Sequence, residues 1–203
     1  MVRIHVKAAA AEAEEQQFLY SCSCDSSIAD LADAILEIYN LQAWIQALCV
    51  HVRQYLLTDA FRENCAGVAD VLDRTLSEAG TYASKEQVLH QRFLSSHFLR
   101  DHIQTIEKEV KIARSRGLPE SNTQITTFTP ELHKDVQLIW AGKELSRGKR
   151  LCDYIGGNEK TKITIKLKLG CEDLENRMVT NVQEENDICL QLVPCASHAY
   201  CLG

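Results

Sequence analysis

The residues best suited to chemistry lie near the end of the chain. Cys195, His198 and Cys201 follow one another at intervals of three residues, and Cys189 precedes them. Tetrahedral zinc is bound by sets of thiolates and imidazoles of this kind. The spacing matches no familiar zinc knuckle, however, and the surrounding residues have no strand or turn pattern. We therefore expect no metal here and favour scattered structural thiols.

The remaining cysteines and histidines also fit structural roles. The chain has nine cysteines and no secretory signal pattern, so we expect reduced thiols. Cys22 and Cys24 are too close in sequence for an ordinary metal or redox pair, and on a predicted strand they share one face. His90 and His97 are predicted to share a helix face, without a cysteine or acidic partner at ligand spacing.

Patterns typical of catalysis or of nucleic-acid binding do not occur. The sequence has no Gly-x-Ser-x-Gly elbow, and Gly156-Gly157-Asn158 precedes a predicted strand rather than a helix. Aromatic residues make up only 6% of the chain, and its net charge is −6. We therefore predict a protein that is not an enzyme, needs no cofactor and does not bind nucleic acid.

The composition is typical of a globular protein inside the cell. Hydrophobic residues make up 45% and charged residues 25% of the 203 positions. No run approaches the roughly 18 apolar residues of a membrane span. Because Met1–Lys7 also lacks the apolar core of a signal peptide, we expect a soluble, cytoplasmic chain with no membrane association.

The basic residues are concentrated in one segment. Between His133 and Leu169 there are nine Lys or Arg and four acidic residues, whereas the rest of the chain is strongly acidic. Such a polarity favours a site for an acidic partner surface. A solvated strand face explains it equally well, and both interpretations stay open. The candidate partner-binding residues are Lys143, Arg147, Lys149, Lys160, Lys162, Lys166 and Lys168.

The first forty residues predict two strands and a helix. Val2, Ile4 and Val6 alternate with polar residues, and a second strand is expected over residues 16–24. Asp25-Ser26-Ser27 supplies the side chains that cap a helix start, and apolar residues follow at helical spacing.

The middle of the chain predicts three further helices. Apolar stripes cover residues 41–56 and 68–79, and a longer helix is expected from about Ser84 to Ser115. Gly117-Leu118-Pro119 is a typical helix stop, and residues 120–130 form a polar loop.

The pattern then returns to strands. Residues 136–141 predict a strand, Gly142-Lys143 a turn and residues 151–154 a short turn-like element. Residues 162–169 alternate perfectly, with Ile163, Ile165 and Leu167 on one face and lysines on the other. Periodicity ends after Leu169, so we expect a poorly ordered tail over residues 170–203.

The stretch Leu138-Ile-Trp-Ala-Gly-Lys-Glu-Leu through Leu151-Cys-Asp-Tyr154 resembles the second half of ubiquitin. It implies an α+β fold in which a ubiquitin-like β-grasp sheet forms from both ends of the chain, around a helical insertion. The final strand then lies parallel to the first, which a crossover of this length permits. The expected parts are the first half of the sheet (1–40), the insertion and loop (41–132), the second half (133–169) and the tail.

A narrower resemblance is to the Kurly family, the cilia- and flagella-associated protein 298 family. It is carried by Met1-Val-Arg-Ile-His-Val-Lys7, by Gly117-Leu-Pro119 and above all by Trp140-Ala-Gly-Lys-Glu-Leu145 and Gly157-Asn-Glu-Lys-Thr-Lys-Ile163. The resemblance implies a largely cytoplasmic factor needed to assemble axonemal dynein arms, and so for cilium movement. The expected partners are dynein assembly factors, chaperones or dynein subunits.

Two other functions remain as alternatives. One is a structural protein fixed to the axoneme, and the other is a ubiquitin-like interaction adaptor. Against conjugation, residues Gly156-Gly157 are internal rather than at the end of the chain. The tail also lacks the helical, acidic extension expected of the Kurly family.

Overall fold

The computed structural model describes residues 1–8, 16–117 and 132–170. The chain elements in order are β1 (Val2–Ala8), β2 (Gln16–Cys22), α1 (Ile28–Tyr55), α2 (Asp59–Asn64), α3 (Ala66–Ala83), α4 (Glu86–Leu89), α5 (Ser96–Gly117), β3 (Val136–Trp140), β4 (Lys143–Glu144), α6 (Cys152–Ile155) and β5 (Lys162–Leu169). The tail with its cysteine and histidine cluster lies outside the described residues.

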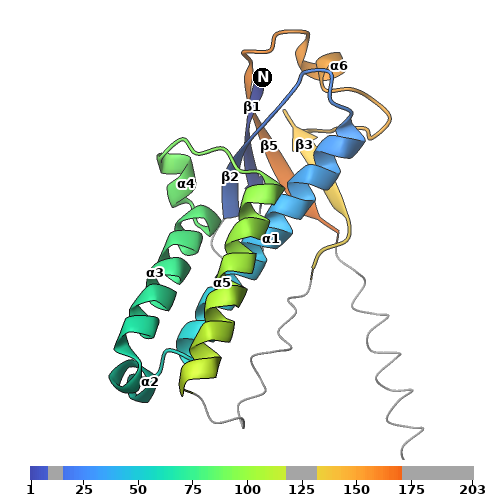
Figure 1. The fold of residues 1–203 in the computed structure, drawn as a ribbon. Helices are drawn as coiled ribbons and strands as arrows, with labels where there is room; N and C mark the ends of the chain where they lie inside the picture. Colours follow the sequence, from blue (N-terminus) through green and yellow to red (C-terminus); the bar gives the residue numbers. More distant parts are fainter. Residues whose placement is uncertain (9–15, 118–131, 171–203) are drawn as a thin grey trace, which may run out of the picture. The chain divides into compact units, whose positions relative to one another are not determined.

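The strands form one sheet in the order β2-β1-β5-β3-β4. The first and last strands of the described chain are neighbours and run parallel, with Ile4 opposite Ile163 and Val6 opposite Ile165. The other pairings are antiparallel. The predicted fold class is therefore confirmed, because strands from both ends of the chain share one hydrogen-bonded sheet (Figure 1).

The inner face of this sheet packs against the first half of α1. Ile4, Val6, Phe18 and Ile165 are fully buried and belong to one hydrophobic cluster with the helix residues. Strands β1 and β5 alternate buried with half-buried or exposed positions, as expected for a sheet with one covered face. Burying such side chains contributes about 1.5–3 kcal/mol each relative to exposure.

Ser27 starts α1, as the sequence predicts. Its hydroxyl oxygen accepts a hydrogen bond from the Asp30 N–H at 3.0 Å, which satisfies one of the free amides of the first turn. The helix then continues for 28 residues. The sequence suggested two separate helices that meet near residue 40. The structure instead has the single helix α1, whose first half packs against the sheet and whose second half packs against the helical layer.

The helical layer consists of α3 and α5 packed against the second half of α1 (Figure 1). Leu72 and Leu76 of α3 and Leu99 and Ile106 of α5 are fully buried. The thiol of Cys49 on α1 donates to the Leu76 carbonyl at 3.4 Å. These apolar stripes therefore form an internal core.

The expected helix over residues 84–115 is wrong in its first third. After the four-residue α4, Gln91 adopts a left-handed conformation with φ of 55°, and α5 begins only at Ser96. The side-chain amide of Gln87 donates to the Gln17 carbonyl of β2 at 2.8 Å, and the Leu94 N–H donates to the Leu19 carbonyl. The helix breaks because this segment satisfies the backbone of an edge strand.

The break also places His90 and His97 on different elements. His90 caps α4, whereas His97 lies on α5 and contacts Asp101 at 3.0 Å. The prediction of a shared helix face is therefore wrong. Strand β2 likewise ends at Cys22, so Cys24 lies beyond the strand, although both thiols are buried.

Glu159 joins the two halves of the sheet. Its carboxylate accepts hydrogen bonds from the Ser23 hydroxyl at 3.0 Å and the Cys24 N–H at 2.9 Å, and it contacts the Met1 amino group at 2.9 Å. A hydrogen bond from the Cys24 thiol, together with these contacts, holds the pKa of Glu159 low, at about 2. The pKa of Cys24 is raised to about 11, first because the thiol donates to this carboxylate.

Candidate protein-interaction surface

The outer face of the sheet carries a cluster of basic side chains. Lys162, Lys166 and Lys168 of β5 are exposed and alternate with the buried apolar residues of the same strand. The register places Arg3 of β1 opposite Lys162, and Lys7 opposite Lys166. We call these five residues the basic face.

The parallel seam between β1 and β5 is what assembles the basic face. Arg3 and Lys7 alternate with Val2, Ile4 and Val6, which point into the core. Strand spacing is about 4.8 Å, so cations on neighbouring strands lie close together. Residues more than 150 positions apart in sequence thus meet in two rows of like charge.

The neighbouring outward residues of the sheet are His5, Thr164, Ile139 and Glu144. His5 lies opposite Thr164, and its Nε2 is 2.9 Å from the Gln17 side-chain oxygen. Ile139 of β3 lies opposite Lys166, and Glu144 lies opposite Ile139. Glu144 is the acidic residue among the outward positions of the described strands, and it lies at the far edge from β1.

None of the five cations of the basic face forms an ion pair within the described part of the chain. Arg3 lies over the Phe93 ring at 5.9 Å, which holds its guanidinium beside the edge of the sheet. Several arginines of the helical layer are paired instead. Arg53 contacts Asp73 at 3.3 Å, and Arg100 pairs with Glu37.

The structure separates the seven cations that the sequence grouped. The three β5 lysines lie together on the outer face, whereas Lys160 precedes the strand. Lys143 lies opposite Trp140 at the edge of the sheet. By register, this position belongs to the covered side of the sheet rather than to the outer face.

Arg147 and Lys149 have neighbours of their own. Arg147 contacts Asp33 of α1 at 3.1 Å and Asp135 at 3.2 Å. The Lys149 ammonium lies 5.5 Å from the centre of the Tyr154 ring. Neither residue belongs to the basic face.

Arg3 and Lys7 are the members that our sequence analysis omitted. The alternation of residues 1–7 already places them opposite the apolar side chains, and the parallel pairing was itself predicted. Only the register, which sets Arg3 beside Lys162 rather than beside Thr164, needed the structure.

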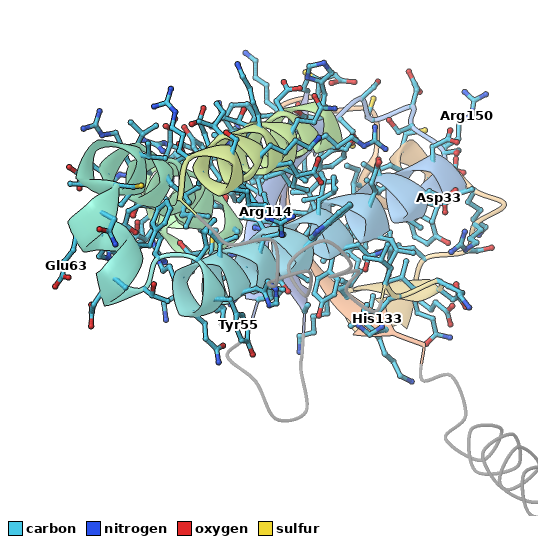
Figure 2. The ribbon with its side chains drawn as sticks, turned by 60° about the horizontal axis from the view of Figure 1, so that its bottom comes forward. Asp33, Tyr55, Glu63, Arg114, His133 and Arg150 are labelled. Carbon is cyan, nitrogen blue, oxygen red and sulfur yellow. The ribbon has the colours of Figure 1, made fainter. Side chains whose placement is uncertain are left out.

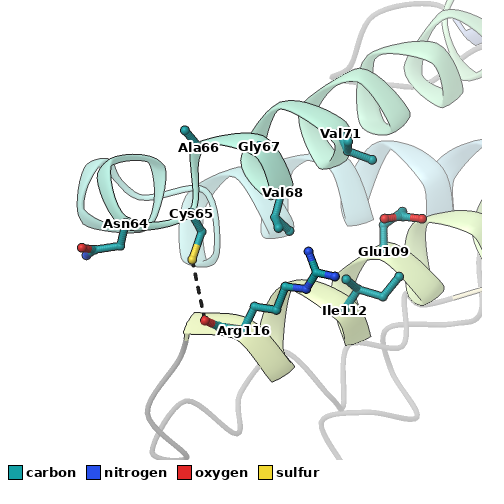
Figure 3. Close-up of a pocket in the computed structure, with 9 residues that line it drawn as sticks. All are labelled: Asn64, Cys65, Ala66, Gly67, Val68, Val71, Glu109, Ile112 and Arg116. Carbon is teal, nitrogen blue, oxygen red and sulfur yellow. Dashed lines mark hydrogen bonds between the residues drawn. The ribbon is translucent and has the colours of Figure 1, made fainter.

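The described surface also has a hollow between the start of α3 and the end of α5 (Figure 3). Its volume is about 690 Å³, and Cys65, Glu109 and Arg116 supply its polar groups. The Cys65 thiol donates to the Arg116 carbonyl at 3.7 Å rather than to a base. Among the described residues, no side-chain base accepts a hydrogen bond from this thiol, so the hollow gives no support to catalysis by it.

A second hollow lies along α1 beside the segment that leads into β3. Leu36, Trp44 and Leu132 line it, with Arg100 at its rim. Asn40 fixes this segment, because its side-chain amide donates to the His133 carbonyl at 2.9 Å and its oxygen accepts from the His133 N–H. His133 is labelled in Figure 2.

Two classes of site receive no support from the described residues. Within residues 1–8, 16–117 and 132–170, no group of three or more His, Cys, Asp or Glu side chains is arranged to hold a metal. Over the same ranges, every helix is too short or too polar to cross a bilayer.

Known proteins resemble the chain over most of its length. The model of the family cilia- and flagella-associated protein 298 matches residues 136–186. The cilia- and flagella-associated protein 298 of Danio rerio is 28% identical, over 83% of this chain and 76% of its own length. The Xenopus laevis protein 298-B is 28% identical over 91% and 81%, and the Homo sapiens protein 298 is 25% identical over 83% and 76%. No solved structure matches the chain.

These matches confirm the resemblance that the sequence motifs indicate. The family match covers β3, β4, α6 and β5, which include the motifs from Trp140 to Ile163. It ends at residue 186, beyond β5. The names of these relatives describe no enzymatic activity.

Proposed function

Since the chain is related to the cilia- and flagella-associated protein 298 family, we propose that it is a non-enzymatic motility factor. Its role is that of a cytoplasmic adaptor in the assembly of axonemal dynein arms. The observation that carries the proposal is the match to relatives named for cilia and flagella, which supports a cilium-related role. Dynein subunits, their chaperones or other assembly factors are the proposed partners.

The seven cations predicted from the sequence supply the proposed partner-binding set. Its centre is the exposed trio Lys162, Lys166 and Lys168. Arg147 contributes only if a partner carboxylate replaces Asp33 or Asp135. Within the described part of the chain the β5 lysines form no ion pair, which supports the proposal because a charged partner need not break one to reach them.

Disruption of the gene in a flagellated cell tests the role. We expect immotile or weakly beating flagella, with dynein arms missing in electron micrographs of the axoneme. Normal arms and normal beating would refute the proposal. Re-expression of the intact chain is the control, because it should restore both arms and beating.

Cell fractionation separates the adaptor from a fixed axonemal component. After detergent extraction, an assembly factor should be found mainly in the cytosolic extract. Recovery in the axonemal pellet would instead support the structural alternative. A tagged outer-arm dynein subunit should mark the pellet in the same preparation.

A further inference from the structure

We propose that the basic face binds an extended acidic segment of a protein partner, whose carboxylates alternate along the strand direction. The inference deepens the adaptor role proposed above and rests on it for the partner's identity. Its own basis is the arrangement of Arg3, Lys7, Lys162, Lys166 and Lys168 on one uncovered side of the described sheet.

The first argument is the electrostatic cost of this arrangement. Arg3 opposite Lys162 and Lys7 opposite Lys166 are two like-charge pairs, and such pairs destabilise a sheet. Carboxylates placed between the two strands would neutralise both rows at once. A local rule broken in the same way at two rows of one seam is typical of a functional surface.

The second argument is the spacing of the cations. Outward side chains of one strand recur about every 6.7 Å. Lys162 and Lys166 are thus about 13 Å apart along β5, and Lys168 follows after about 7 Å. An extended segment that runs with β5 matches this spacing with acidic residues at positions i, i+4 and i+6.

The third argument concerns the row between the cations. His5 and Thr164 occupy it, and the His5 ring is close to the Gln17 amide. This row suits an uncharged polar residue at position i+2, such as serine. The fitting motif is therefore acidic-x-polar-x-acidic-x-acidic, with the x side chains facing solvent.

The surface chemistry favours a polypeptide over a nucleic acid. Proteins that bind single strands on an open sheet stack bases on aromatic side chains. The outward positions of β1 and β5 hold cations, His5 and Thr164, but no Phe, Tyr or Trp. Phe93 lies at the edge of the sheet, beside Leu19 of β2, with the Arg3 guanidinium 5.9 Å from its ring centre.

Titration of the full chain by two-dimensional nitrogen-15 NMR tests the proposal. The probe is the peptide Glu-Ser-Ser-Ser-Glu-Ser-Glu with blocked ends, at low salt. We expect shifts confined to residues of β1 and β5, and an affinity that falls as salt is added. A peptide of equal composition, Ser-Ser-Glu-Glu-Glu-Ser-Ser, should bind severalfold more weakly because its carboxylates do not match the cation spacing.

A matched pair of variants assigns the binding to the surface. The triple variant K162E/K166E/K168E should weaken peptide binding about tenfold or more, since one exposed ion pair changes an equilibrium constant about two- to threefold. The control variant R74E/K108E/K111E alters three exposed cations of the helical layer by the same net charge. It should bind like the unaltered chain.

Each result decides the inference. Equal binding of the two peptides, equal loss in both variants, or tighter binding of a single-stranded oligonucleotide would overturn it. The outcome is separable from the ciliary role. Failure of peptide binding with dynein arms still lost on disruption removes only the surface, whereas intact binding with normal arms removes only the proposed function.

Discussion

Reversing the charge of Lys162 and Lys166 should stabilise the fold while removing the binding surface. Each residue lies opposite a cation of β1, Arg3 or Lys7, and like charges at such positions cost about 0.2–1 kcal/mol. Glutamate at both positions replaces two repulsions with two attractions. We expect the free energy of unfolding of K162E/K166E to rise by about 1 kcal/mol, or about 2–4 °C in Tm.

Chemical denaturation at low salt and in 1 M salt measures this effect. The gain should shrink at high salt, where the Debye length is about 3 Å. The single variant K168E is the matched control, because Lys168 lies opposite the uncharged Gln137. Lys and Glu are both depleted in strands, so propensity should change little.

The opposite result would refute the reasoning. If K162E/K166E unfolds more easily than K168E at low salt, the two rows do not repel one another as the register requires. If the gain persists unchanged in 1 M salt, its cause is not the charge. A stabilised variant that no longer binds the acidic peptide would also show that loss of binding is not loss of folding.

Three further predictions concern the core and its titratable groups. The variants V6A and I165A should each lower the free energy of unfolding by about 2 kcal/mol or more. A double-mutant cycle should show a coupling of about 0.5–3 kcal/mol, because the two buried residues are partners across the seam. Additive losses would contradict this. Burial lowers the pKa of His102, so the neutral form is favoured in the fold. Unfolding free energy measured against pH should therefore fall as pH drops below about 6.5 towards the lowered pKa, and H102F should flatten this slope. In native protein at pH 8, mass spectrometry should find Cys24 alkylated far more slowly than the less buried Cys65, because the pKa of Cys24 is about 11, and denaturation should remove the difference.

The sheet was predictable because its signals are local and strong. The strict alternation of β5 fixes which side chains are buried, and Ser27 fixes where α1 begins. The two-residue turn between β3 and β4 was also visible as a glycine signal. Ala141 and Gly142 both have positive φ there, which is typical of a tight hairpin turn.

The break between α4 and α5 could not be read from the sequence, because its cause is tertiary. Local propensity favours a helix through residues 84–95, but Gln87 and Leu94 bond to the backbone of β2 instead. An edge strand that needs partners thus overrides helical periodicity. The continuity of α1 has a similar origin, since its two stripes face two different layers of the same core.

The sequence analysis found three of the five cations of the basic face and omitted two, again because their position depends on tertiary structure. Charge composition finds residues that are close in sequence, so it grouped Arg147 and Lys149 with the β5 lysines. It could not find Arg3 and Lys7, whose membership depends on a seam between the two ends of the chain. A charge cluster on a sheet is defined by register, and register is a long-range property.

The period of two in β5 makes its structural role and its proposed binding role separable. Ile163, Ile165 and Leu167 hold the seam to β1, while the lysines that alternate with them are exposed. Truncation of an inward residue should weaken both stability and binding, because β1 then holds Arg3 and Lys7 less firmly on the face. Loss of one outward lysine should weaken binding about two- to threefold and leave the core intact. The basic face thus depends on the seam of the split sheet, since β1 contributes two of its cations and β5 three.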